Sequence, residues 1–150
     1  MRFRGLVLAA ALALQGCQAG GLAGGDDFGP DLFANTASAK LEAGKTYFRR
    51  ADFGLAEQSF LDALKLDATD AEAWVGLAAS YDRLGRYDLA DKAYEKAVKV
   101  AGRRPEILNN MGYSYFLRGE RARARKTFEE AARLAPENPV VKANLGLVSG

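Results

Sequence analysis

The sequence of 150 residues contains no histidine and a single cysteine, Cys17. Histidine is the commonest general base and the commonest transition-metal ligand in proteins, and a lone cysteine forms no disulfide within its own chain. Lysine and arginine number 21 against 19 aspartates and glutamates. This near balance does not call for the concentrated basic surface that is typical of nucleic-acid-binding domains. We therefore expect a protein that is not an enzyme, has no metal or other cofactor, and binds no nucleic acid.

The first 16 residues have the pattern of an export signal. Arg2 and Arg4 precede an unbroken apolar run over residues 5–14, which is shorter than the roughly 20 residues that a transmembrane helix needs. A basic start followed by a short apolar run and small residues is typical of secretory signal peptides. The sequence thus predicts that residues 1–16 are a signal peptide.

The segment Leu14-Gln15-Gly16-Cys17 resembles the lipobox of bacterial lipoproteins. In that family the chain is cut before the cysteine, which is then acylated, so the resemblance implies a lipid anchor on Cys17. Several acyl chains anchor a protein stably, whereas one chain holds it only marginally. Gln18 follows the cysteine, and in the sorting pattern of enteric bacteria a residue other than Asp implies an outer-membrane lipoprotein facing the periplasm.

Residues 17–36 join this anchor to the rest of the chain. They are rich in glycine and aspartate and show neither a helical nor a strand period, which predicts a flexible linker after the lipidated cysteine. Fully extended, residues 18–36 would span about 65 Å. The linker contains Phe28, Leu32 and Phe33, and the sequence leaves open whether they dock on the domain that follows.

From residue 37 onward the sequence repeats every 34 residues without insertions. Tyrosine recurs in this way at Tyr47, Tyr81 and Tyr115. The other columns of similar residues are Ala56, Ala90 and Ala124; Phe60, Tyr94 and Phe128; and Ala63, Ala97 and Ala131. This period belongs to the tetratricopeptide repeat, and residues 37–150 resemble that family. The resemblance implies an all-α solenoid of antiparallel helix pairs, with three 34-residue repeats and a terminal helix.

Local signals place the ends of the helices. Gly85 and Gly119 suit the left-handed position after a helix, and Pro105 and Pro139 suit the first turn. Helices are predicted over residues 37–49, 54–66, 71–83, 88–100, 105–117, 122–134 and 139–147.

Two further expectations concern the second copy of the repeat. Thr69 followed by Glu72 predicts a capping box at the start of the helix over residues 71–83. We also expect Trp74 in the core, where truncation to alanine would cost about 3–5 kcal/mol if the ring is fully buried.

The resemblance also implies that partner proteins bind on the concave face of the solenoid. This face carries the first helix of each pair, at positions between the packing columns, such as Lys45, Phe48, Val75 and Gly76. The sequence favours its C-terminal part, because asparagine amides both donate and accept hydrogen bonds and aromatic rings add apolar contact to a bound peptide. The candidate groove residues are Asn109, Asn110, Tyr113, Phe116 and Asn144. Alternatively, the asparagines bond only within the groove itself.

Two features near the C-terminus have their own interpretations. Val141, Leu145 and Val148 lie at spacings of 4 and 3 in a final helix that no second helix follows, and we expect an exposed apolar strip that a partner or a second copy covers, giving a homo-oligomer. A cluster of basic residues is either a patch for an acidic partner or anionic lipid, or a solvated helix face with local acidic partners. The cluster consists of Arg118, Arg121, Arg123, Arg125 and Lys126.

The function class that follows is an envelope scaffold or adaptor for protein partners. The segment over residues 108–113, followed by Gly119, is similar to the repeats of the tight-adherence (Flp) pilus assembly lipoproteins, which implies a role in assembling a secretin and a pilus or secretion machine. The alternatives are a pilotin for another secretin or type IV pilus, and a general adaptor docking peptidoglycan or outer-membrane assembly proteins. A hydrolase using Asp67 and Asp70 is also conceivable, although helix capping explains these residues better.

Overall fold

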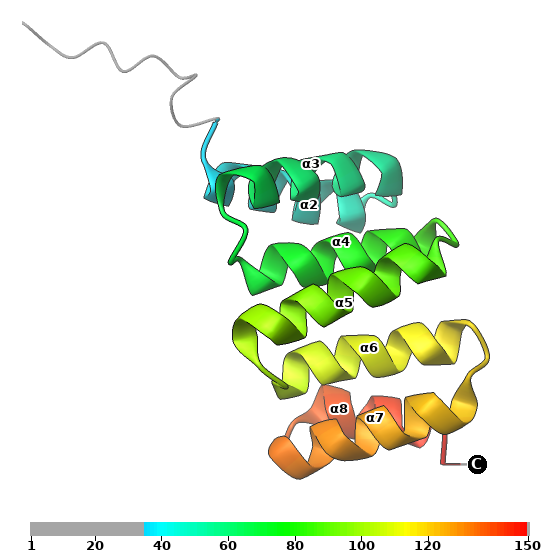
Figure 1. Cartoon of the computed structure of the whole chain (residues 1–150). Coiled ribbons are helices and arrows are strands. Elements are labelled where there is room, and N and C mark those ends of the chain that lie inside the picture. Colours follow the sequence, from blue (N-terminus) through cyan, green and yellow to red (C-terminus); the bar gives the residue numbers. More distant parts are fainter. Residues whose placement is uncertain (1–34, 150) are drawn as a thin grey trace, which may run out of the picture.

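The computed structural model describes residues 35–149, so the predicted signal peptide, Cys17 and most of the predicted linker lie outside the described residues. The described part of the chain contains seven helices and no strand (Figure 1). The helices are α2 (Ala37–Arg49), α3 (Phe53–Leu66), α4 (Ala71–Arg83), α5 (Tyr87–Ala101), α6 (Pro105–Leu117), α7 (Arg121–Leu134) and α8 (Pro139–Gly146). Every predicted helix is confirmed, with ends within one residue of those expected. None of these helices is long and apolar enough to cross a membrane.

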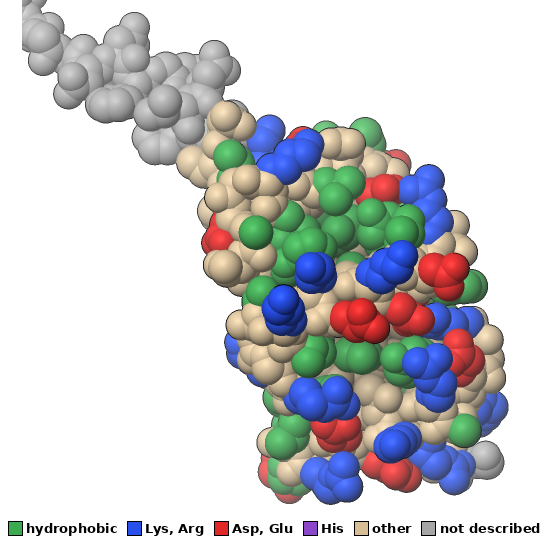
Figure 2. All heavy atoms as spheres, in the orientation of Figure 1, with side chains coloured by type: hydrophobic (Ala, Val, Ile, Leu, Met, Phe, Trp, Pro, Cys, Tyr) green, Lys and Arg blue, Asp and Glu red, His purple; other side chains and the backbone are tan. Residues whose placement is uncertain are grey.

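The helices stack as antiparallel pairs into one elongated array. The pairs are α2 with α3, α4 with α5, and α6 with α7, while α8 packs on both helices of the last pair (Figure 1). The predicted solenoid of three helix pairs and a terminal helix is thus confirmed. Figure 2 shows the face on which apolar side chains gather over the N-terminal repeat, whereas charges of both signs cover the later repeats.

Close contact between phenylalanine rings and glycine backbones holds the pairs together. The ring of Phe60 on α3 lies so close to Gly44 on α2 that a Cβ atom added there would be 2.7 Å from it. A Cβ atom added at Gly76 of α4 would meet the same ring at its outer end, around Cζ. In the third copy, an added Cβ at Gly112 of α6 would lie 2.6 Å from the ring of Phe128. Such distances exclude a side chain at these glycines without movement of the packed helices.

A buried polar network joins the second and third copies. The carboxylate of Asp82 on α4 is 6% exposed and accepts hydrogen bonds from Ser114 Oγ at 2.7 Å and from the Tyr94 hydroxyl at 3.3 Å. Arg118 donates to Ser114 Oγ at 2.8 Å and forms a two-point ion pair with Asp91, with the shorter contact at 2.6 Å. Because these residues come from both copies, the network fixes the position of α6 relative to α4 and α5.

The start of α4 differs from the expected capping box. The N-cap is Asp70, whose carboxylate accepts from the backbone N–H groups of Glu72 at 2.9 Å and Ala73 at 3.0 Å. Thr69 instead donates through its hydroxyl to the carboxylate of Asp67 at 2.7 Å. The capping box was wrong because α4 begins at Ala71, which leaves Asp70 adjacent to the free N–H groups of the first turn.

Trp74 is only partly buried. Its ring packs against the core of the first two copies, and its indole N–H donates to the carbonyl oxygen of Ala68 at 2.9 Å. Trp74 therefore packs on the core as expected, but its ring is not fully buried, so the loss on truncation to alanine should fall below the range for a fully buried ring.

The exposed strip predicted on the last helix is also wrong. Val141 and Val148 are each 1% exposed, and Leu145 packs partly buried against the third copy. Val141 forms a cluster with Leu108 and Ala131. The side chains at spacings of 4 and 3 therefore face the preceding helix pair. Gly146 marks the side that faces away from the preceding pair, because no atom of residues 35–149 outside its own helix lies within 4 Å of a Cβ added there. This finding removes the basis for a homo-oligomer formed through Val141, Leu145 and Val148.

The glycine contacts give a matched pair of substitutions, since Gly112 and Gly146 are 34 residues apart in the same column. Alanine normally improves a helix by up to about 1 kcal/mol over glycine. Gly112→Ala should nevertheless lower the free energy of unfolding by about 1–3 kcal/mol, because the methyl group meets the Phe128 ring. Gly146→Ala should leave the free energy of unfolding within about 1 kcal/mol of the wild-type value. Urea denaturation measures both, and equal effects would contradict the packing.

The network at Asp82 predicts a pH dependence. Burial raises the pKa of Asp82 in the folded protein above its value in the unfolded chain, about 3.9. The folded state then binds more protons, so the contribution of Asp82 to stability is greatest below about pH 4 and falls as pH rises through the folded pKa. Asp82→Asn removes this titration. Its free energy of unfolding, relative to wild type, should rise between about pH 3 and pH 7 in urea titrations; a flat or falling difference would contradict the burial.

Candidate protein-binding groove

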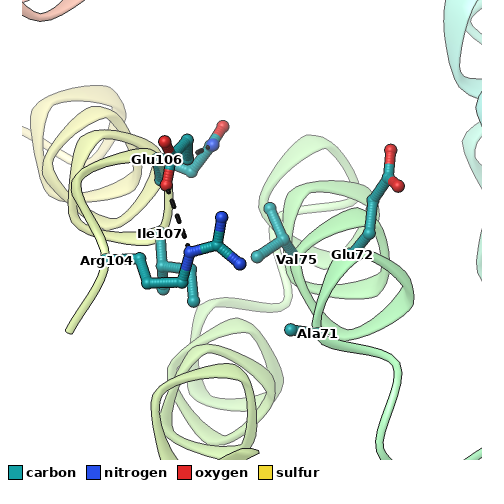
Figure 3. Close-up of a pocket in the computed structure, with 7 residues that line it drawn as sticks. Ala71, Glu72, Val75, Arg104, Glu106 and Ile107 are labelled. Carbon is teal, nitrogen blue, oxygen red and sulfur yellow. Dashed lines mark hydrogen bonds and ion pairs between the residues drawn. The ribbon is translucent and has the colours of Figure 1, made fainter. Parts of the chain in front are cut away.

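Two adjoining hollows lie along the face formed by α2, α4 and α6. The first, of about 400 Å³, lies between the N-terminal ends of α4 and α6 (Figure 3). Its lining residues are Ala71, Glu72, Val75, Arg104, Glu106, Ile107 and Asn110. Figure 3 shows the guanidinium of Arg104 extending from the start of α6 toward Val75 on α4. We call this the α4–α6 hollow.

The second hollow, of about 270 Å³, lies between α2 and α4, and we call it the α2–α4 hollow. Its lining residues are Lys45, Phe48, Arg49, Phe60, Glu72, Val75, Gly76, Ala79 and Asn110. Three residues line both hollows, namely Glu72, Val75 and Asn110. The two hollows are therefore parts of one groove, which runs across the first helices of the three copies.

The floor of the α2–α4 hollow is apolar because Gly76 has no side chain. Every larger residue there would project onto the ring of Phe60, so the glycine leaves that ring as part of the lining. Phe48 forms one wall, and its ring meets Phe53 edge-on at 5.3 Å between centroids. The guanidinium of Arg83 lies over the Phe53 ring at 4.5 Å. This arrangement suits an apolar side chain of a bound peptide.

The rim of the groove carries charges of both signs. Lys45 Nζ lies 2.6 Å from Glu72 and 2.9 Å from Glu42, and these hydrogen bonds raise the pKa of Lys45. Arg104 Nε is 3.6 Å from Glu106. Arg49, in contrast, donates only to the Thr46 hydroxyl at 2.9 Å and pairs with no carboxylate among residues 35–149. One unpaired guanidinium is thus available at the mouth of the α2–α4 hollow.

The side-chain amides of the three predicted asparagines form hydrogen bonds within the protein. Asn144 Nδ2 donates to Asn109 Oδ1 at 3.0 Å, and Asn110 Nδ2 donates to the carbonyl oxygen of Glu106 at 2.8 Å. Asn110 alone of the five predicted residues lines the two hollows. The alternative in which the asparagines bond within the groove thus describes their side chains in the unbound protein.

The two aromatic residues of the predicted set lie farther along α6. Tyr113 is 41% exposed and its ring centroid is 6.1 Å from that of Phe116. The structure therefore brings together Tyr113 with Phe116, but it places neither of them in the hollows. The sequence places Lys45, Phe48, Val75 and Gly76 on this face but does not rank them above its other residues. The sequence feature that could have pointed to this part of the face is the glycine at residue 76, which leaves the floor of the hollow uncovered.

The basic cluster near the C-terminus is mostly engaged within the protein. Arg118 is paired with Asp91, while Arg123 pairs with Glu120 at 2.6 Å and lies over the Tyr115 ring at 4.1 Å. Arg121 donates to the carbonyl oxygen of Leu147, and Arg125 to that of Val148. These contacts account for four of the five basic residues within the protein. The solvated face with Glu129 and Glu130 as partners is nevertheless not what forms, because the acceptors are Asp91, Glu120 and backbone carbonyl oxygens, and the Arg118 side chain is only 9% exposed.

Comparison with known proteins agrees with this architecture. Residues 69–137 match the tetratricopeptide repeat family model. The structure from a functional characterization of Pseudomonas aeruginosa pilF superposes with a TM-score of 0.68 and is 31% identical over 75% of this chain. The chain covers only 52% of that protein, about half its length. A search of the curated proteins finds no match.

Two further solved structures share the fold. MamA is 26% identical with a TM-score of 0.60, and the match covers 69% of this chain and 61% of MamA. The first tetratricopeptide repeat domain of Spaghetti (RPAP3), bound to an HSP90 peptide, is 21% identical with a TM-score of 0.67, covering 77% of this chain and 92% of that domain. The fold is therefore that of a tetratricopeptide repeat solenoid, a class of typically non-catalytic scaffolds that mediate protein–protein interactions.

Proposed function

We propose that the protein is a non-catalytic adaptor that binds partner proteins in the groove lined by α2, α4 and α6. The observation that carries this proposal is the continuity of the two hollows, which share Glu72, Val75 and Asn110. An apolar floor with polar groups at its rim is the usual form of a peptide-binding groove. The floor at Phe60 and Gly76 would hold an apolar side chain, while the rim would orient the peptide backbone.

The adaptor would be attached to the bacterial outer membrane and face the periplasm. The support is the lipobox-like sequence ending at Cys17, behind a basic and apolar N-terminus. A lipid on Cys17 would leave the 19 residues 18–36 between the membrane and α2, a length of about 65 Å at full extension. The repeat domain would then reach partners that stand off the membrane surface.

We further propose that the protein resembles TadD, the tight-adherence (Flp) pilus assembly lipoprotein. The similarity rests on residues 108–113 and Gly119 together with the short layout of three repeats behind a lipobox. We propose on this basis a role in assembling a pilus or secretion machine, including its secretin. The 31% identity with Pseudomonas aeruginosa pilF supports a bacterial tetratricopeptide repeat protein. A general envelope adaptor would retain cell-wall or outer-membrane assembly proteins instead.

Affinity purification of the full chain from envelopes, followed by mass spectrometry, tests the groove. Val75→Glu places a charge in both hollows and should reduce the retained partners at least tenfold, because an apolar contact would have to desolvate the new carboxylate. Val100→Glu is the matched control, since Val100 is 39% exposed on α5 and lines neither hollow. Equal losses in both variants, or no loss in either, would contradict groove binding.

Cys17→Ser tests the anchor. The variant cannot be acylated through sulfur, so we expect most of it to move from the membrane fraction to the soluble periplasmic fraction, as fractionation and immunoblotting would measure. A variant that remains with the outer membrane in the same proportion as wild type would overturn the lipid anchor. Gln18→Asn, which leaves the cysteine in place, should stay membrane-bound.

A further inference from the structure

The chemistry of the α2–α4 hollow specifies more than an apolar ligand. Phe48, Phe60 and Val75 make its surface apolar, and its 270 Å³ volume exceeds the roughly 150 Å³ cavity that is known to hold a benzene ring. At its mouth, Arg49 has no carboxylate partner among the described residues. A guanidinium at the edge of an apolar hollow favours a peptide with an aromatic side chain next to a carboxylate.

A segment of the same chain has this composition. Residues 26–33 contain Asp26, Asp27 and Asp31 together with the large apolar residues Phe28, Leu32 and Phe33. No lysine or arginine occurs between residues 18 and 36, so the segment is uniformly acidic. Its charge is therefore complementary to Arg49, and its aromatic residues match the floor of the hollow.

The segment is also long enough to reach the hollow. Lys45, Phe48 and Arg49 of α2 line it, and they lie about 12–18 Å along the helix from residue 37. Phe28 precedes residue 35 by seven residues, which span about 24 Å when extended. Phe28 can thus lie in the hollow if the chain turns back along α2, whereas Leu32 and Phe33 would lie nearer the start of that helix.

We propose that residues 26–33 occupy the α2–α4 hollow of their own chain, with Phe28 on the floor and Asp26 or Asp27 paired with Arg49. The inference rests on the proposed function, because it makes the partner site self-occupied until a partner displaces the segment.

Disulfide trapping in the full chain tests this contact. With Cys17→Ser in the background, Gly29→Cys is combined with Ala79→Cys, since Gly29 adjoins Phe28 in the sequence and Ala79 lines the hollow. The control combines Gly29→Cys with Gln58→Cys, because Gln58 is exposed on α3 and lines no part of the hollow. The pair in the hollow should form its intramolecular disulfide at least tenfold faster than the control pair in purified, partner-free protein.

Charge provides the second measurement. Arg49→Glu should slow trapping of the pair in the hollow several-fold, whereas Arg133→Glu, at an exposed arginine on α7, should not. Equal rates for the two cysteine pairs, or a rate unaffected by Arg49→Glu, would overturn the proposal. Disulfides that form mainly between two chains, and faster at higher concentration, would assign the segment to a second copy and likewise overturn it. If trapping fails while Val75→Glu still loses partners, only this inference falls.

Discussion

The rest of the structure depends on the contact of the Phe60 ring with two glycine backbones. Gly44 and Gly76 allow α2 and α4 to approach the same ring, so one side chain of α3 sets the spacing of three helices. In the third copy, Phe128 and Gly112 make the corresponding contact within one pair. A single methyl group at any of these glycines would force the helices apart, because a closely packed interior does not absorb added volume.

The same contact explains why the groove has an apolar floor. Gly76 lies on the first helix of its copy, where a larger residue would have covered the ring of Phe60. Farther along the solenoid, the hydrogen bonds of Asp82 and Ser114 and the ion pair of Arg118 with Asp91 hold α6 in place. Packing between the first two copies therefore forms the α2–α4 hollow, whereas the polar contacts between the second and third copies hold α6 against α4 at the ends of these helices away from the α4–α6 hollow.

The sequence predicted the helices closely because the 34-residue columns, the glycines after helices and Pro105 and Pro139 all agree. The sequence failed to predict the exposure and the hydrogen-bond partners of side chains that depend on where a neighbouring helix packs. The spacing of Val141 and Val148 shows that they share a face, but that face packs on the preceding pair. Asn109 and Asn144 are 35 residues apart, and only the stacking of α6 and α8 brings their amides together. The role of Gly76 likewise depends on a ring 16 residues earlier.

The central claim is that partners bind across the first helices of the copies. Hydrogen–deuterium exchange of the full chain, alone and with a partner recovered from envelopes, tests it most directly. The account predicts that slowed exchange on binding concentrates in α2, α4 and α6. Slowed exchange confined to α3, α5 and α7, with those three helices unchanged, would contradict it.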